Sequence, residues 1–304
     1  MTEFWDNEPS PLQTVHDPFL DKFGIKLFVK RDDLLHQEVS GNKWRKLKYN
    51  ILEAKQNDFA SLLTFGGAYS NHIAATAAAG KLFDLQTIGI IRGDELTPDS
   101  NPTLRRAKEN GMKLIFVSRT EYEGKIELAQ KYGQGSYVLP EGGTNLLAAR
   151  GASEIMDEIV AQLGYYPNYV TVPLATGGTF AGLCTKSTLQ TRVLGFTVIK
   201  NGEYLLPQIN DIIATVGNPN ETNYDIFWDF HCGGYAKTTP ELLGFIDRFQ
   251  TQTGIEIEPV YSGKMFYWLY ELIGRNGDYF EPNQTIVAIH TGGLQGKSKP
   301  LLVL

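Results

Sequence analysis

The chain is poor in cysteine. It has only two, Cys184 and Cys232, and neither lies in a Cys-x-x-Cys pair. A disulfide-stapled fold is therefore excluded, and a reducing compartment is favoured. The sequence also lacks any run of about 18 apolar residues that would cross a bilayer. Its first residues, MTEFWDNEPS, lack the apolar core of a signal peptide. We therefore expect a cytoplasmic protein without a membrane partner.

The chain also lacks an excess of positive charge, since Lys and Arg total 28 against 34 Asp and Glu, for a net charge of -6. The densest basic stretch contains Lys43, Arg45, Lys46 and Lys48. These side chains would wrap around a helix and would not tile one face, so a nucleic-acid partner is not expected. The 5 histidines show no ligand spacing, and we predict no metal site.

Strand-like and helix-like segments alternate along the whole chain. Helices are predicted over 42–56, 146–163 and 239–254, the last with Thr239-Pro240 at its start and Gly254 at its end. The alternation predicts an α/β fold with a mostly parallel sheet. Residues 1–24 are predicted to form an irregular lead-in. The segment IEIEPVYSGK, 255–264, is predicted to be a strand that runs into a loop.

One glycine-rich turn, Thr176-Gly177-Gly178-Thr179, follows an apolar strand and precedes a helix. Backbone N–H groups in such a turn converge on an anion, and the helix dipole adds positive charge. The turn matches neither GxGxxG nor GxxxxGK[ST], so a single phosphate is favoured over a dinucleotide or a nucleoside triphosphate. The alternative is a tight turn that needs glycine only for its positive φ.

Lys43 follows Asn42 at the predicted start of helix 42–56. A lysine amine in such a place can attack a carbonyl carbon and form a Schiff base. The alternative is a solvated helix lysine, which is the common case for this residue type. A Schiff-base lysine combined with a single-phosphate turn is what pyridoxal 5′-phosphate (PLP) requires. We therefore predict PLP as the cofactor.

Six short motifs occur in a fixed order: GNKWRKLKY, GGAYSNH, PEGGTN, TGGTFAGL, PVYSGK and HTGG. Together they resemble the D-cysteine desulfhydrase and 1-aminocyclopropane-1-carboxylate (ACC) deaminase family, PLP enzymes of the tryptophan-synthase β fold (fold type II). The resemblance implies a two-lobed α/β fold with mostly parallel sheets flanked by helices. The large PLP-binding lobe would comprise 1–44 plus 150–304, and a smaller inserted α/β lobe would comprise 45–149. It also implies a small amino-acid substrate and a homodimer.

The resemblance further implies roles for individual residues. Lys43 would hold PLP and later move the substrate α-proton. The other implied cofactor-binding residues are Lys46, which would reach the phosphate, Asn71 at the pyridine 3′-oxygen, Thr291 at the pyridine nitrogen, and Thr176, Gly177, Gly178 and Thr179 in the phosphate turn. The implied substrate-binding or catalytic residues are Ser70, Asn71, His72, Tyr235, Tyr261 and Ser262.

Two of these positions distinguish the branches of the family. ACC deaminases typically read Pro-Val-Tyr-Glu-Gly and His-Leu-Gly-Gly, whereas this chain has Ser262 and Thr291, as desulfhydrases do. A hydroxyl at the pyridine nitrogen supports a weaker electron sink than a carboxylate, which suits β-elimination of a good leaving group. The resemblance therefore favours a lyase that releases ammonia and an α-keto acid from D-cysteine or a related β-substituted amino acid. The alternatives are ACC deaminase, a racemase or threonine-dehydratase-like enzyme, and a PLP-binding protein without turnover. The last gains weight because Ala74 stands where the family often has arginine.

Overall fold

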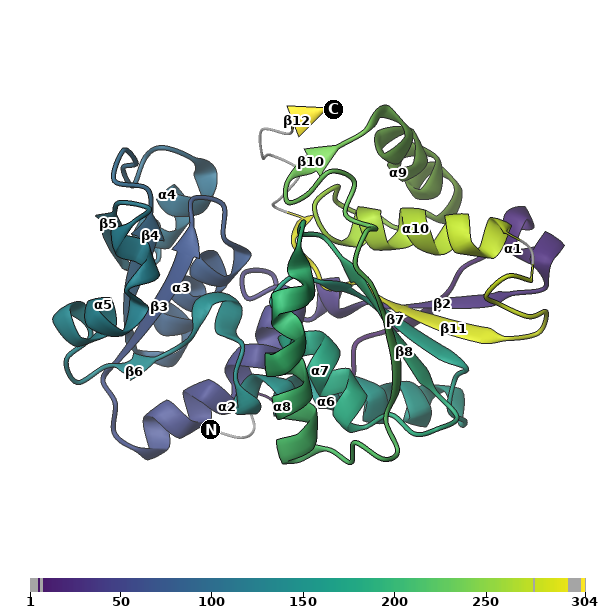
Figure 1. Ribbon diagram of the computed structural model, residues 1–304. Coiled ribbons are helices and arrows are strands. Elements are labelled where there is room, and N and C mark those ends of the chain that lie inside the picture. The colour runs from purple at the N-terminus through teal and green to yellow at the C-terminus, as the bar shows by residue number, and fades with distance from the viewer. Residues whose placement is uncertain (1–4, 6–7, 276, 295–301, 304) are drawn as a thin grey trace.

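The computed structural model describes residues 5, 8–275, 277–294 and 302–303. Among the described residues, the two largest sheets lie in two lobes, a smaller one formed by early residues and a larger one formed mostly by later residues, and a third sheet has only two short strands (Figure 1). Within these sheets every pairing is parallel except that of β1 with β2. The expected α/β fold with mostly parallel sheets is therefore confirmed. In spatial order, the larger sheet has β1 (Leu12–Thr14), β2 (Lys26–Lys30), β11 (Thr285–Ile289), β7 (Tyr169–Leu174), β8 (Arg192–Thr197) and β9 (Asn223–Phe227), and the smaller sheet has β5 (Lys113–Val117), β4 (Gln86–Arg92), β3 (Ser61–Gly67) and β6 (Tyr137–Val138).

Helices cover both faces of the larger sheet. Its inner strands β7 and β11 are mostly apolar and buried on both faces, as is typical of parallel sheets. Successive side chains of β11 show this: Ile286 packs in one core and Val287 in the other. The covering helices are α1 (Pro18–Phe23), α9 (Pro240–Thr253) and α10 (Ser262–Gly274) on one face, and α6 (Leu146–Leu163), α7 (Gly178–Thr185) and α8 (Leu206–Val216) on the other (Figure 1).

The smaller lobe repeats this arrangement at a smaller scale. The side of β3 that carries Leu62 packs with α2 (Asn42–Gln56) and α3 (Asn71–Phe83), and the side that carries Leu63 packs with α5 (Lys125–Tyr132). The helix α4 (Pro102–Glu109) packs beside α3. All strands of the smaller sheet lie within 61–138. This range falls inside the predicted inserted lobe, whose exact bounds stay a prediction.

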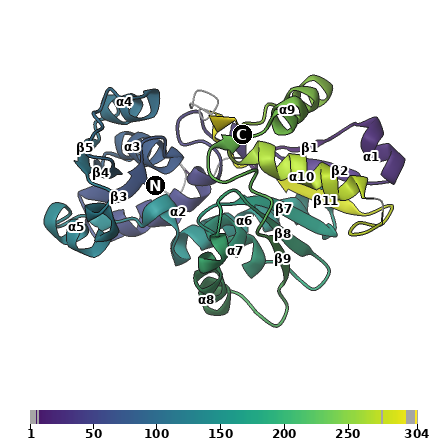
Figure 2. The same ribbon diagram turned by 45° about the horizontal axis from the view of Figure 1, so that its top comes forward.

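The helix α2 runs from the junction of the lobes into the smaller lobe (Figures 1 and 2). Its start is fixed to the larger lobe by a buried ion cluster. Arg45, only 4% exposed, donates to Asp32 Oδ1 at 2.9 Å and also pairs with Glu158 of α6. A Cβ on Gly151 of α6 would lie 2.0 Å from the Arg45 carbonyl oxygen, so the two helices are in close contact. The residues that follow Gly41 are therefore held at the edge between the lobes.

Two sequence predictions about the fold were wrong. The lead-in 1–24 contains β1 and α1, and α1 is capped by Asp17, whose carboxylate accepts the Phe19 N–H at 2.8 Å. The segment 255–259 forms no strand, although its isoleucines are buried. It ends in a turn in which Glu258 accepts the N–H groups of Val260, Tyr261 and Ser262 at 2.7–2.8 Å, so it does not continue into strand pairing.

Candidate active site

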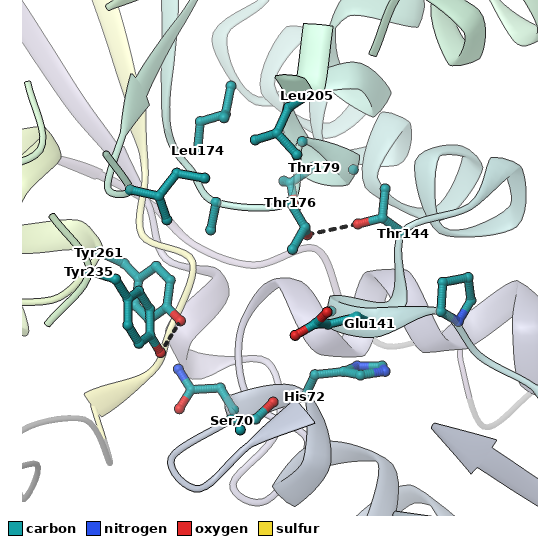
Figure 3. Close-up of a pocket in the computed structure, with 18 of the residues that line it drawn as sticks. Ser70, His72, Glu141, Thr144, Leu174, Thr176, Thr179, Leu205, Tyr235 and Tyr261 are labelled. Atoms are coloured by element: carbon teal, nitrogen blue, oxygen red, sulfur yellow. Dashed lines mark hydrogen bonds between the residues drawn. The ribbon is translucent and has the colours of Figure 1, made fainter. Parts of the chain in front are cut away.

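A cavity of about 1070 Å³ lies between the two lobes. It opens where the strands β3 and β7 end and the helices α3 and α7 begin, which is where ligands bind in open α/β folds. Figure 3 shows Thr144 and Thr176 on one side of it, Ser70 and His72 on another, and the two tyrosines facing them. The predicted site residues that line this cavity are Lys43, Lys46, Ser70, Asn71, His72, Thr176, Gly177, Gly178, Thr179, Tyr235, Tyr261 and Thr291.

Lys43 lies in the first turn of α2, half-buried at the cavity wall. Its Nζ is 3.1 Å from the Oδ1 of Asn42. The Asn42 side chain also donates to Thr179 Oγ1 at 2.9 Å, and its backbone N–H donates to the Thr291 carbonyl at 3.1 Å. These bonds join the start of α2 both to the glycine-rich turn and to the segment after β11. The amine is therefore presented at a fixed point of the cavity.

The glycine-rich turn forms a cradle at the N-terminus of α7. Gly177 has φ +77, a left-handed conformation that favours glycine. A Cβ on Gly178 would lie 2.9 Å from Thr144 Oγ1 and 3.1 Å from Lys46 Nζ, so a side chain there would fill the cradle. The N–H groups of the first helical turn have no partners within the helix and suit an anion. The geometry fits a single phosphate group.

Lys46 lies one turn after Lys43 on α2 and is 1% exposed. Its Nζ donates to the Gly142 carbonyl at 2.6 Å and to Thr144 Oγ1 at 3.0 Å. Burial, together with the positive charge of Lys43, holds the pKa of the Lys46 amine well below its usual value. An anion in the adjacent cradle would raise that pKa again, because an opposite charge favours the ammonium form. The residues at this end of the cavity therefore fit the phosphate and the aldehyde of PLP.

Ser70 caps the N-terminus of α3, where its Oγ accepts the Ile73 N–H at 3.3 Å. The first turn of this helix, with Asn71 and His72, faces the cavity. Its backbone N–H groups and the helix dipole favour a carboxylate at this point.

Two replacements of Ser70 distinguish its role as the N-cap of α3 from a role in binding the substrate. We expect Ser70→Ala to lower the free energy of unfolding by about 0.5–2 kcal/mol, since the cap is lost. We expect Ser70→Gly to lower it by only a few tenths of a kcal/mol. Both variants lose the hydroxyl, so both should lose the same factor in kcat/KM if it contacts substrate. Urea unfolding and steady-state kinetics measure the two effects. Equal stability losses in both variants would contradict the capping role.

His72 does not present its ring for binding a carboxylate. It is 2% exposed, and its Nε2 is 2.9 Å from Thr64 Oγ1. The Thr64 hydroxyl donates its only proton to the Leu139 carbonyl at 3.1 Å, so it accepts from the Nε2–H of His72 and leaves Nδ1 as an acceptor. Burial and the nearby lysines hold the pKa of His72 well below its ordinary value, so the ring is neutral. Only the backbone N–H of His72 remains suitable for a carboxylate.

Tyr235 and Tyr261 meet at the cavity wall, with their hydroxyl oxygens 2.9 Å apart (Figure 3). Burial, and the neighbouring Tyr235, raise the pKa of Tyr261 well above its ordinary value. Tyr261 therefore keeps its proton at neutral pH. Tyr235 is 44% exposed and comes from the loop before β10 (Lys237–Thr238), so the pair joins two separate parts of the larger lobe.

Ser262 is the predicted site residue that the structure does not bring to the cavity. It is fully buried, and its Oγ accepts the Glu258 N–H and donates to Glu258 Oε1, both at 3.2 Å. Its hydroxyl is thus used within the turn that starts α10. Thr291, in contrast, lines the cavity.

Thr144, which had no predicted role, contacts the glycine-rich turn through a 2.7 Å bond from its hydroxyl to Thr176 Oγ1. The signal was present, because Thr144 belongs to the motif PEGGTN. Across the described part of the chain, no three His, Cys, Asp or Glu side chains are grouped so that they could hold a metal ion. Within the same residues, no helix has the length and apolar character needed to span a membrane.

Comparison with known proteins places this geometry in a family. The model of the family described as pyridoxal-phosphate dependent enzyme matches residues 6–292. The chain is 32% identical over 310 residues to a bifunctional D-cysteine desulfhydrase/ACC deaminase, mitochondrial, of Arabidopsis thaliana, covering 95% of this chain and 77% of that one. It is 31% identical over 305 residues to a putative ACC deaminase of Thermotoga maritima, covering 95% of both.

Solved structures agree with this placement. The crystal structure of an ACC deaminase homologue superposes with a TM-score of 0.82 at 27% identity, covering 95% of this chain and 91% of that one. A fungal L-serine ammonia-lyase from Rhizomucor miehei, at 16% identity and a TM-score of 0.69 over 94% of each chain, shares the fold. The protein is therefore an enzyme that uses PLP, and it belongs to the pyridoxal-phosphate dependent enzyme family, with D-cysteine desulfhydrases and ACC deaminases among its relatives.

Proposed function

We propose that this enzyme is a lyase that deaminates a small amino acid by β-elimination, with D-cysteine or a related β-substituted amino acid as substrate. The products would be ammonia, an α-keto acid and the departing β-substituent. The observation that carries this choice is Thr291, which lines the cavity beside the start of α2 with a hydroxyl group and not a carboxylate. The names of the relatives support a substrate of this class.

The residues of the cavity divide the work between binding and proton transfer. The glycine-rich turn and Lys46 would hold the phosphate of PLP, and Asn71 and Thr291 would contact its ring. When bound, PLP supplies an electron sink for bond cleavage at the substrate α-carbon. The N-terminus of α3, through the Ser70 hydroxyl and backbone N–H groups, would bind the substrate carboxylate.

Two groups would then move protons. Lys43 Nζ lies at the cavity wall in the first turn of α2, from where it would take the substrate α-proton. Tyr261 Oη keeps its own proton, because burial raises its pKa, and its partner Tyr235 is close enough to replace that proton. The tyrosine pair would therefore protonate the departing β-substituent.

The family alternative, ACC deaminase, is tested by comparing two substrates on one preparation. We expect sulfide and keto acid from D-cysteine with a kcat/KM at least about tenfold above that for keto acid from ACC, a difference of about 1.4 kcal/mol in transition-state stabilisation. Sulfide and keto-acid assays measure the two rates. Keto acid from ACC without sulfide from D-cysteine would reverse the order of the two hypotheses.

The same experiment addresses the remaining alternatives. A PLP-binding protein without turnover would change its visible spectrum on addition of D-cysteine but release no product. A racemase or threonine-dehydratase-like enzyme would turn over amino acids without sulfide. We also keep a homodimer and a cytoplasmic location as proposals, and the latter is supported by two buried cysteines that form no disulfide.

A further inference from the structure

A buried lysine outside the cavity lies next to the loop that carries Tyr235. Lys264 is in the first turn of α10 and is 0% exposed. Its Nζ donates to the carbonyl oxygens of His231 at 2.8 Å and Gly234 at 2.6 Å. Burial lowers the pKa of this amine to about 8, so at neutral pH it is mainly the ammonium ion and can donate both bonds. The titratable groups around it are Cys232, Glu258 and His231.

The loop 231–236 needs an anchor, because its backbone is strained. Cys232 has φ 49 and Ala236 has φ 57, conformations that non-glycine residues rarely adopt. Gly233 and Gly234 between them also have positive φ, at 84 and 119. Such a backbone persists only where surrounding contacts determine it. The two bonds from Lys264 end on the carbonyl groups of His231, just before this strained stretch, and of Gly234, within it.

The other end of the anchor is rigid. Tyr261 immediately precedes α10, three residues before Lys264. Its N–H donates to Glu258 Oε1 at 2.8 Å, and Glu258 is itself 0% exposed and accepts two further backbone N–H groups. The start of α10 is thus fixed by a buried carboxylate. Lys264 connects this fixed point, which carries Tyr261, to the strained loop, which carries Tyr235.

We propose that Lys264 is a positioning residue, which keeps the Tyr235 hydroxyl against that of Tyr261 by tying loop 231–236 to the first turn of α10. The consequence for turnover rests on the proposed function, in which the tyrosine pair transfers a proton. The anchoring of the loop does not depend on that function, so the two can be measured separately.

The test compares two buried lysines in the holoenzyme. Lys264→Met keeps the apolar stem and removes both bonds, and we expect amide hydrogen exchange over 231–236 to become about tenfold faster or more. We also expect kcat on D-cysteine to fall about tenfold with little change in KM, because the proton donor and not the binding site is displaced. Lys30→Met is the control for loss of a buried lysine elsewhere, since Lys30 is also 0% exposed, donates to the Ser10 carbonyl at 2.6 Å and pairs with Glu158 at 2.6 Å. This control should lose stability, and any faster exchange should be spread along the chain and not concentrated in the loop.

The outcomes distinguish the anchoring of the loop by Lys264 from the role of the tyrosine pair in turnover. Unchanged exchange over 231–236 in Lys264→Met, or an increase that is uniform along the chain as in Lys30→Met, overturns the proposal. Faster exchange confined to the loop with unchanged kcat supports the anchor and instead removes the tyrosine pair from the proposed function. If Lys264→Met does not fold, Lys264→Gln, which keeps two N–H donors on a shorter stem, provides the same readout, with a smaller increase expected in the loop.

Discussion

Lys43→Ala is expected to lower turnover by at least about 10³-fold, because it removes both the amine that would hold PLP and the base that would move the α-proton. The fold should remain, since Lys43 lies half-buried at the cavity wall and outside the hydrophobic cores. Steady-state assays with D-cysteine give the loss of kcat. Far-UV circular dichroism and the thermal midpoint show whether the chain is still folded.

A second lysine of the same helix provides the control. Lys48 lies on α2 but is outside the cavity lining and forms an ion pair with Glu154 at 2.8 Å. Such partly exposed pairs contribute only about 0–1 kcal/mol, so Lys48→Ala should leave turnover near that of the parent. Full activity in Lys43→Ala, or an equal loss in both variants, would contradict the assignment of Lys43.

Among the variants proposed, Gly41→Ala is expected to lower the free energy of unfolding the most. Gly41 has φ +66, and a Cβ there would lie 1.9 Å from the Thr291 carbonyl oxygen and 2.4 Å from its carbon. Both contact atoms are backbone, so neither can move away alone. Strain and overlap together should cost roughly 2–6 kcal/mol in the free energy of unfolding. The added Cβ should also push the two backbone segments apart, which separates Asn42 from Thr291 and weakens PLP binding. A titration of the apoprotein with PLP measures this loss of affinity.

Gly111→Ala is a matched control for the backbone conformation alone. Gly111 has φ +84, and nothing lies within 4 Å of a Cβ built there. This variant should lose about 1–2 kcal/mol from the positive φ, and its affinity for PLP should not change. Equal losses in Gly41→Ala and Gly111→Ala, measured by urea unfolding, would show that the close approach of Gly41 to Thr291 does not limit stability.

The sequence predicts best those elements whose signals are local. The helix predicted over 42–56 has the observed bounds, as does the helix over 146–163, where the Asn145 side chain caps the start and Gly164 ends it in a left-handed conformation. Thr239 and Gly254 likewise mark both ends of α9. The strand predicted at segment 255–259 was wrong because alternating apolar residues indicate burial and do not by themselves indicate strand pairing. Ile255 and Ile257 are buried, but the chain turns at Glu258.

For the site, the resemblance carried by the six motifs predicted the residues that line the cavity, except that Ser262 lies outside it. Lys43, Ser70 and Thr176 line one cavity because the ends of β3 and β7, which belong to different sheets, both face it. The sequence could not show how each side chain is used, because the partners come from distant segments. His72 is oriented by Thr64, and Ser262 is bonded to Glu258. Lys264, which follows Ser262 in the motif PVYSGK, had no assigned role, since its carbonyl partners lie about thirty residues earlier.

The central claim is that Lys43 is the residue that holds PLP, and one measurement tests it directly. Reduction of the holoenzyme with borohydride makes the bond between PLP and its lysine permanent, and mass spectrometry of the digested protein then locates the modified peptide. We predict a single pyridoxyl group on Lys43, within GNKWRKLKY. A modification on Lys46 or any other lysine, or no modification of a preparation that has bound PLP, would contradict the account.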